Sequence, residues 1–293
     1  MDTLNSYNAR ILDRLSLYLN YMPDAIDKKQ VDELCTDNAD TSTKEYAFGT
    51  LLAAYCGLDT EYSCTDRKIF RSCFTRMVKL QHAQSFSCDE YYKNIKFPEI
   101  SVGEWQFKLE AFKPYEAFLI DETQIQPDGT LLPQIGFFES EFCYPAVLQN
   151  GREWMTITPH EINSTKNAVS QSRGRVLTYG LGLGYFTYLA SLKDEVESVT
   201  VAELDSSLIG LFEKYLLPQF PYRDKIRIVN TDAFDFAQKY TQNGEFDFIF
   251  ADTWHDPSDG VDMYLRFKAL ENNNSKTVYS YWIEKTLKYY MSH

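Results

Sequence analysis

The sequence has 293 residues, 44% of them hydrophobic and 15% aromatic, so the chain can bury the core of two domains and is not generally disordered. Its 29 basic residues face 42 acidic ones, and the net charge of −13 argues against a nucleic-acid partner. The richest basic window, residues 67–79, alternates with apolar residues and fits the solvated face of a helix.

The six cysteines lack the spacing of metal ligands, so no metal site is expected. The sequence shows no signal peptide and no apolar run near the roughly 20 residues that a membrane span requires. We therefore expect a cytoplasmic protein with free thiols and no membrane partner. The sequence leaves a homodimer open.

Residues 1–100 are expected to be helical, because apolar residues such as Ile11, Leu15 and Leu19 recur at intervals of four. Residues 101–158 have the alternating pattern of strands and are expected to form a small β-rich region.

Asn150-Gly151 lies between two apolar runs of this β-rich region and predicts a two-residue hairpin of the primed type. The second strand leads to His160 and Glu161, which follow Pro159. One interpretation is the N-terminus of a helix, where a glutamate stabilises the first turn. The alternative is that both side chains belong to a ligand site.

Residues 159–293 alternate between strand and helix patterns, which predicts a parallel sheet with ligands at the carboxyl ends of its strands. The strand at 176–179 runs into Gly180, Gly182 and Gly184, where the backbone can turn sharply and approach a ligand. A second strand ends in Glu203, whose carboxylate could accept both hydroxyls of a ribose. Together these features predict a site for an adenosine-containing cofactor.

The glycine spacing resembles motif I of the class I S-adenosylmethionine-dependent methyltransferases, and residues 201–205 look like the end of their second strand. Residues 230–235 resemble the loop that brackets the adenine, and residues 246–252 resemble the fourth strand. The resemblance implies a Rossmann-like fold and S-adenosyl-L-methionine as cofactor. It implies a cofactor site formed by Gly180, Gly182, Gly184, Glu203, Leu204, Asp232, Ala233 and Asp252.

Within this superfamily, the sequence is most similar in character to the polyamine synthases, or aminopropyltransferases. It shares their Glu-hydrophobic-Asp pattern at 203–205, and His160-Glu161 resembles the His-Glu pair that precedes their glycine turn. It departs from them at Leu183, where that family has an acid that holds the amine of the aminopropyl group. This departure argues against aminopropyl transfer.

The loop after the fourth strand has the groups that alkyl transfer requires. Asp252 should line the reaction site, and His255 is the best general-base candidate because its ordinary pKa of about 6.5 is near neutral. Trp254 could contact the sulfonium through its ring or be a core residue, and His255 could be an ordinary loop histidine. We assign Asp252 and His255 to catalysis. We place Trp254, Asp256, His160 and Glu161 at the substrate.

We therefore expect an enzyme that transfers a methyl group from S-adenosylmethionine to a small molecule. Two alternatives stay open: aminopropyl transfer, and a module that binds the adenosyl cofactor without turnover. Residues 279–290 are expected to form a terminal helix instead of the closing strands of a full methyltransferase sheet.

Overall fold

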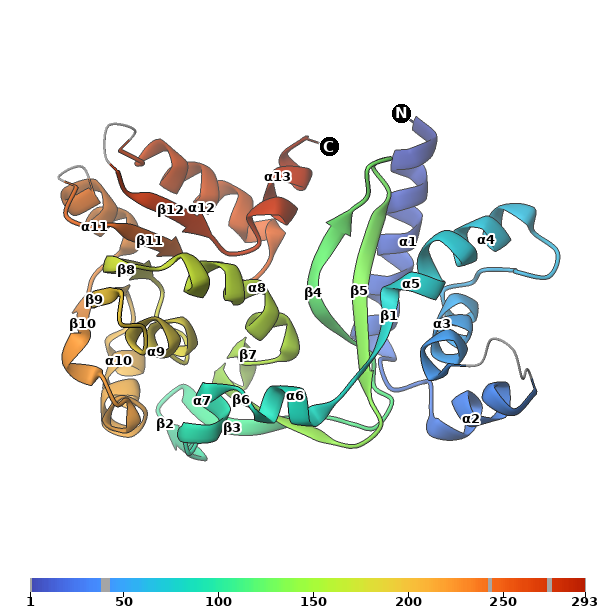
Figure 1. Ribbon diagram of the computed structural model, residues 1–293, viewed down its shortest axis with the longest axis horizontal. Helices are drawn as coiled ribbons and strands as arrows, with labels where there is room; N and C mark the ends of the chain where they lie inside the picture. The colour runs from blue at the N-terminus through green and yellow to red at the C-terminus, as the bar shows by residue number, and fades with distance from the viewer. Residues whose placement is uncertain (1, 38–42, 242–243, 273–275, 293) are drawn as a thin grey trace. The chain divides into compact units, whose positions relative to one another are not determined.

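The computed structural model describes residues 2–37, 43–241, 244–272 and 276–292. They group into two compact units (Figure 1). Unit 1 consists of Met1–Phe86 and Ala111–Cys143, and unit 2 consists of Ser87–Glu110 and Tyr144–His293. The chain thus passes from one unit to the other within the region 101–158. The division of the sequence into regions 1–100, 101–158 and 159–293 stays a prediction.

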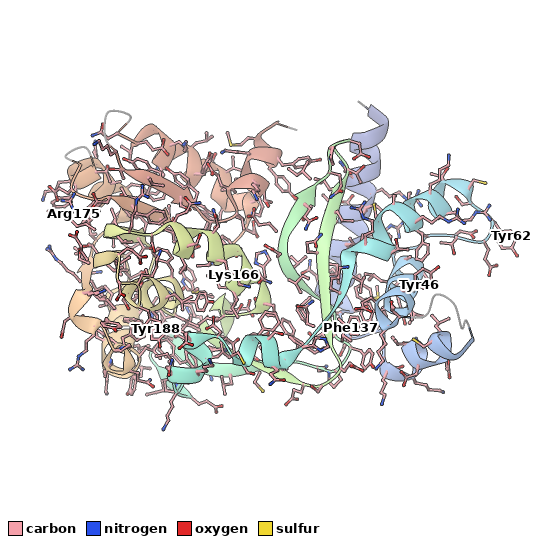
Figure 2. All side chains as sticks on the ribbon, in the orientation of Figure 1. Tyr46, Tyr62, Phe137, Lys166, Arg175 and Tyr188 are labelled. Carbon is pink, nitrogen blue, oxygen red and sulfur yellow. The ribbon has the colours of Figure 1, made fainter. Side chains whose placement is uncertain are left out.

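Unit 1 packs helices on a three-stranded sheet of order β1-β5-β4. Phe48 and Phe137, both fully buried, stack with ring centroids 4.3 Å apart; Phe137 is labelled in Figure 2. The elements that begin in this unit are α1 (Asp2–Tyr21), α2 (Lys28–Asp37), α3 (Lys44–Tyr55), α4 (Cys64–Ile69), the π-helix Phe70–Phe74, α5 (Thr75–Met77), β1 (Val78–Gln81), α6 (Ala83–Ser87), β4 (Phe118–Ile125), β5 (Leu131–Phe138) and β6 (Phe142–Gln149).

The expectation of a helical N-terminal region holds except at β1 and at Ile100, where β2 begins. Strand β1 pairs in parallel with β5, so Val78 lies opposite Ile135, and both side chains are buried. Burial against a strand more than fifty residues away overrides the local helical pattern, because strand preference depends on packing between neighbours.

Unit 2 contains a second small sheet of order β2-β3-β6-β7, formed by β6 together with β2 (Ile100–Val102), β3 (Trp105–Phe112) and β7 (Arg152–Thr156); α7 (Glu90–Asn94) precedes it in the chain. Asn150 and Gly151 join β6 to β7 with φ angles of 53° and 76°. Two positive φ angles define the primed turn that suits the twist of a hairpin, so this prediction is confirmed.

The main sheet of unit 2 is parallel throughout and has the order β10-β9-β8-β11-β12. This arrangement confirms the predicted α/β, Rossmann-like fold. Its strands are β8 (Gly174–Tyr179), β9 (Val196–Glu203), β10 (Ile226–Asn230), β11 (Phe248–Ala251) and β12 (Val278–Tyr281).

Helices cover both faces of this sheet (Figure 1). On one face, Leu177 and Ile249 share a core with residues of α11, α12 and α13. On the other face, the ring of Phe186 in α9 packs against those of Phe248 and Phe250 in β11. The helices of unit 2 beyond α7 are α8 (Pro159–Gln171), α9 (Tyr185–Ser191), α10 (Ser206–Tyr215), α11 (Ala233–Tyr240), α12 (Pro257–Ala269) and α13 (Glu284–Ser292), with 3-10 turns at Leu217–Gln219 and Arg223–Lys225.

The expectation of a single helix over 279–290 is wrong in its first part. Tyr279 and Tyr281 belong to β12, which lies beside β11, and the helix α13 begins only at Glu284. The sequence Tyr-Ser-Tyr alternates in polarity, which is the period of a strand, but the stretch is too short to stand out beside a helix. In the described part of the chain, no helix is long and apolar enough to cross a membrane.

Candidate functional site

The glycine turn, residues 180–184, connects β8 to α9 at the carboxyl edge of the parallel sheet. Gly180, Gly182 and Gly184 have φ angles of 92°, 49° and 73°, a region that residues with a side chain rarely adopt. The turn is also closely packed. A Cβ atom on Gly180 would collide with the carbonyl oxygen of Asp252, and one on Gly182 would collide with the sulfur of Met155.

Glu203 ends β9 and is tied to this turn. One carboxylate oxygen accepts a hydrogen bond from the Leu181 amide over 3.0 Å, and the other accepts from the Asp205 amide over 2.8 Å. Each carboxylate oxygen has two lone pairs, so both can still accept from a hydroxyl. Leu204, the next residue, has 68% of its surface exposed. An exposed apolar side chain beside a fixed carboxylate fits an adenosine.

Asp232 and Ala233 lie at the start of α11, on the neighbouring strand end. The Asp232 carboxylate accepts from the amides of Phe234 and Asp235 over 2.8 and 3.0 Å, and it is therefore the N-cap of the helix. The side chain of Asn230 donates to the carbonyl oxygens of Glu203 and Leu204. This link places the Asp232 loop next to the ribose-binding candidate.

Asp252 follows β11, and its amide donates to the carbonyl oxygen of Tyr179 over 3.1 Å. The residue is partly exposed. Burial raises the pKa of this carboxyl group well above its usual value, and the negative charge of Glu161 raises it further.

Glu161 lies in the first turn of α8 and is almost fully buried. Burial raises its pKa, opposed in part by the hydrogen bond that the Thr165 hydroxyl donates to it over 3.0 Å. Glu161, which is buried, and Asp252, which is partly exposed, are thus close enough to repel each other. Two carboxylates in such a position favour a cationic group between or beside them.

Asp89 extends this acidic region, and the sequence motifs did not indicate it. The Tyr185 hydroxyl, at the start of α9, donates to the Asp89 carboxylate over 2.9 Å. The pKa of Tyr185 is raised first by burial and then by Asp89, with smaller effects from Glu161 and Tyr92. The first turn of α9 is therefore within the electrostatic reach of two acids. The only sequence signal at Asp89 is that of a helix cap, a role it also has for α7.

His255 and Asp256 are bound into the start of α12. The His255 ring nitrogen Nδ1 lies 3.0 Å from the Asp259 carboxylate, and Asp256 caps the helix in a reciprocal pair with Asp259. Partial burial raises the pKa of Asp259, but hydrogen bonds from His255 and Asp256 outweigh this effect and hold the pKa below its usual value. The His255 ring lies edge-on to Trp154, 4.6 Å between centroids, and both side chains are partly exposed.

The remaining two candidates lie elsewhere in unit 2. Trp254 is buried in the core between the sheet, α12 and α13, where its ring lies against Gly260. His160 packs edge-on against the Trp282 ring at 5.8 Å. These positions match the structural alternatives that the sequence left open for both residues, and their assignment to the substrate stays a prediction.

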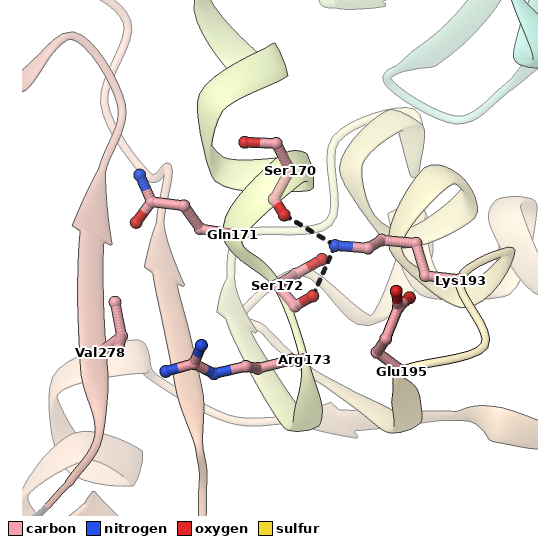
Figure 3. A pocket seen from close by; sticks show the side chains of 7 residues that line it. All are labelled: Ser170, Gln171, Ser172, Arg173, Lys193, Glu195 and Val278. Carbon is pink, nitrogen blue, oxygen red and sulfur yellow. Dashed lines mark hydrogen bonds between the residues drawn. The ribbon is translucent and has the colours of Figure 1, made fainter.

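A pocket of about 450 Å³ lies near the opposite edge of the sheet, where β8 and β12 begin (Figure 3). Its Lys193 side chain donates to the carbonyl oxygens of Val169, Ser170 and Ser172 and so closes the C-terminal end of α8. The pocket lies where strands begin, and the glycine turn lies where β8 ends, so the two are separate. Ligands of parallel sheets bind at the carboxyl ends of the strands, which is the edge with the glycine turn. Among the described residues, no group of three or more His, Cys, Asp or Glu side chains could hold a metal.

Comparisons with known proteins give one family match. Residues 175–269 match the Spermine/spermidine synthase domain. No curated protein sequence matches the chain.

Three similar solved structures each overlap with less than half of the chain. Spermidine synthase from Thermotoga maritima overlaps with TM-score 0.35 and 18% identity, over 45% of this chain and 47% of that one. A spermidine synthase in complex with the transition-state analogue AdoDATO overlaps with TM-score 0.32 and 23% identity, over 39% and 40%. A putative O-methyltransferase from Klebsiella pneumoniae overlaps with TM-score 0.28 and 16% identity, over 36% and 46%.

The chain thus spans less than half the length of each of these structures. The family match includes the glycine turn, Glu203, Asp232 and Asp252. Residues 175–269 therefore resemble the spermine/spermidine synthases, which confirms the resemblance to the polyamine synthase-like branch that the sequence motifs indicated.

Proposed function

We propose that this protein is a transferase that binds an adenosyl sulfonium and transfers its aminopropyl group to an amine. The observation that carries this proposal is the pair of mutually repelling acids, the buried Glu161 and the partly exposed Asp252, of which Asp252 contacts a glycine turn within the matched family region. Aminopropyl transfer from decarboxylated S-adenosylmethionine involves a cationic tail and a cationic acceptor. In methyl transfer, the reaction expected first from the sequence, the ammonium of the cofactor tail is balanced by a carboxylate, and the acceptor need not be cationic.

The residues present fit the adenosyl part of such a cofactor. Glu203 would accept the ribose hydroxyls with lone pairs that the Leu181 and Asp205 amides leave available. The exposed Leu204 would cover one face of the adenine, and Asp232 would accept from its exocyclic amine. The bound sulfonium would supply an activated carbon, so the protein mainly has to orient the acceptor and remove a proton.

Asp252 is the proton acceptor in this proposal. The ionised Asp252 carboxylate takes a proton from the attacking ammonium of the acceptor, and a carboxylate with a raised pKa accepts a proton more readily near neutral pH than an ordinary one. The lone pair set free on that nitrogen forms the new N–C bond, the C–S bond breaks, and the electron pair of the C–S bond stays on sulfur as a neutral thioether. Glu161 would hold the cationic acceptor or tail by charge.

The products distinguish the reactions. The full chain should be incubated with a diamine such as putrescine and either decarboxylated S-adenosylmethionine or S-adenosylmethionine, and the nucleoside product identified by mass spectrometry. We expect methylthioadenosine from the decarboxylated cofactor. S-adenosylhomocysteine from the carboxylated cofactor would instead identify a methyltransferase, and tight binding of either without a product would identify a binding module.

Methyl transfer stays the second candidate because of Leu183. Its side chain is completely buried where the polyamine synthases have an acid, so this position offers no charge to an aminopropyl amine. In our proposal Glu161 and Asp252 supply that charge from α8 and from the end of β11. Substituting both acids should therefore remove aminopropyl transfer, whereas a methyltransferase with a neutral acceptor would keep its cofactor affinity.

A further inference from the structure

Met155 lies against the glycine turn, although nothing in the sequence motifs marks it. It belongs to β7, and its thioether sulfur accepts a hydrogen bond from the Leu183 amide over 3.2 Å. The same sulfur occupies the space that a side chain on Gly182 would need. The surface of the turn that a glycine leaves open is therefore covered by a methionine of the same chain.

Three other amides of the turn donate to stronger acceptors. Gly180 donates to the Ala202 carbonyl over 3.0 Å, Leu181 to the Glu203 carboxylate over 3.0 Å, and Gly184 to the Leu181 carbonyl over 2.8 Å. A thioether is a weak acceptor in comparison. Of these four hydrogen bonds, the one from Leu183 to Met155 is thus the one that a ligand oxygen would exchange most easily.

The surroundings of Met155 disfavour such an oxygen when it belongs to a carboxylate. The Leu183 side chain is completely buried and apolar, and the backbone of Asp252 packs against Gly180, two residues from Gly182. A further negative charge would be added to a turn that already lies against Asp252 at Gly180, and it would have to displace the methionine to reach the Leu183 amide. A cofactor tail without a carboxylate meets neither obstacle.

We propose that Met155 is a specificity-determining residue, which fills the place of the cofactor carboxylate and so selects an adenosyl sulfonium whose tail lacks one. This inference rests on the proposed function and adds a residue outside the matched family region to it. Methionine suits this role because its unbranched side chain can adjust to tails of different length.

The test compares three ligands by isothermal titration with the full chain: methylthioadenosine, which has no tail, decarboxylated S-adenosylmethionine, and S-adenosylmethionine. Met155→Ala empties the space and frees the Leu183 amide, whereas Met155→Leu keeps the volume and removes the sulfur. Met155 is partly exposed, so both variants should fold, and their melting temperatures provide the check.

We expect the wild-type protein to prefer the decarboxylated cofactor. Met155→Ala should bind S-adenosylmethionine about tenfold more tightly, the equivalent of one charge-assisted hydrogen bond, with methylthioadenosine affinity unchanged within about twofold. Met155→Leu should keep the wild-type preference. Unchanged preference in Met155→Ala, or equal relaxation in both variants, would overturn this inference alone. If the wild-type protein does not bind methylthioadenosine, the proposed function fails and this inference fails with it.

Discussion

The buried hydroxyl of Tyr91 donates a hydrogen bond of 2.7 Å to the carbonyl oxygen of Leu183, inside the glycine turn. Tyr91 belongs to the short helix α7, and its ring packs edge-on against Tyr185 and Tyr188 of α9. Burial raises the pKa of Tyr91, so the hydroxyl keeps its proton and remains a donor. A segment more than ninety residues earlier in the chain therefore fixes the conformation of the turn.

Tyr91→Phe should destabilise the protein by about 1–3 kcal/mol, because it leaves the buried Leu183 carbonyl without its partner. Cofactor affinity should fall as well, since the turn loses a support. Urea denaturation and isothermal titration measure the two effects. Tyr62→Phe, at a side chain that is 85% exposed, is the matched control and should change neither. Equal stabilities of the two variants would contradict the role of this bond.

Glu161→Gln should stabilise the protein increasingly as the pH rises. Burial raises the pKa of Glu161 in the folded protein above the value of about 4.3 expected in the unfolded chain. Between these two values the folded state binds more protons, so the stability of the wild-type protein falls with rising pH. Glutamine can still accept the Thr165 hydrogen bond and has no charge to bury.

The variant and the wild type should be equally stable near pH 4, and near pH 8 the variant should be more stable by about 1 kcal/mol or more. Urea denaturation at both pH values checks this expectation. The exposed Glu197→Gln should show no comparable trend with pH. A stability difference that is the same at both pH values would show that the Glu161 carboxyl group does not titrate differently in the two states.

Glu203→Ala should lose most of the stabilisation that an adenosyl ligand provides. At a hundredfold excess over its Kd, the ligand should stabilise the wild-type protein by about 2.7 kcal/mol. Asp205→Asn is the control, because asparagine keeps the cap of α10 and lies only two residues from Glu203. Thermal denaturation with and without methylthioadenosine should give a small shift for Glu203→Ala and a wild-type shift for Asp205→Asn. The opposite order would move the ribose site away from Glu203.

Asp252→Asn should lower the turnover number by about 10²–10⁴, as expected for the loss of a general base. His255→Ala should have a smaller effect, because the His255 ring nitrogen Nδ1 is bound to Asp259 at the start of α12. Initial rates of methylthioadenosine formation, with cofactor affinity measured in parallel, compare the two variants. A loss confined to His255→Ala would assign the base to the histidine that the sequence favoured.

The parts of this protein that the sequence predicted are those with local patterns. The parallel sheet, the Asn150-Gly151 hairpin and the glycine turn between β8 and α9 are each encoded within a few consecutive residues. The acid at the end of β9 could be placed for the same reason, since a strand pattern followed by Glu203 defines the edge of a parallel sheet. The fourth strand was recognised in the same way.

The parts that were missed depend on contacts between distant segments. Asp89 meets Tyr185 across 96 positions of sequence, and Met155 meets Leu183 across 28. Neither Asp89 nor Met155 belongs to a motif, because their side chains act through what they touch in the fold. Strand β12 was missed because four residues give too short a period to separate from the helix that follows.

The close packing of the glycine turn requires glycine there for a reason that is independent of ligand binding. Gly180, Gly182 and Gly184 each lie against protein atoms that a methyl group would strike: the Asp252 backbone, the Met155 sulfur and the Phe212 ring. Any chain with these contacts would need the three glycines to fold, whether or not it binds a nucleotide. A relative that had lost its chemistry would therefore still display the motif, and catalytic competence in such proteins has to be judged from the acids around the turn.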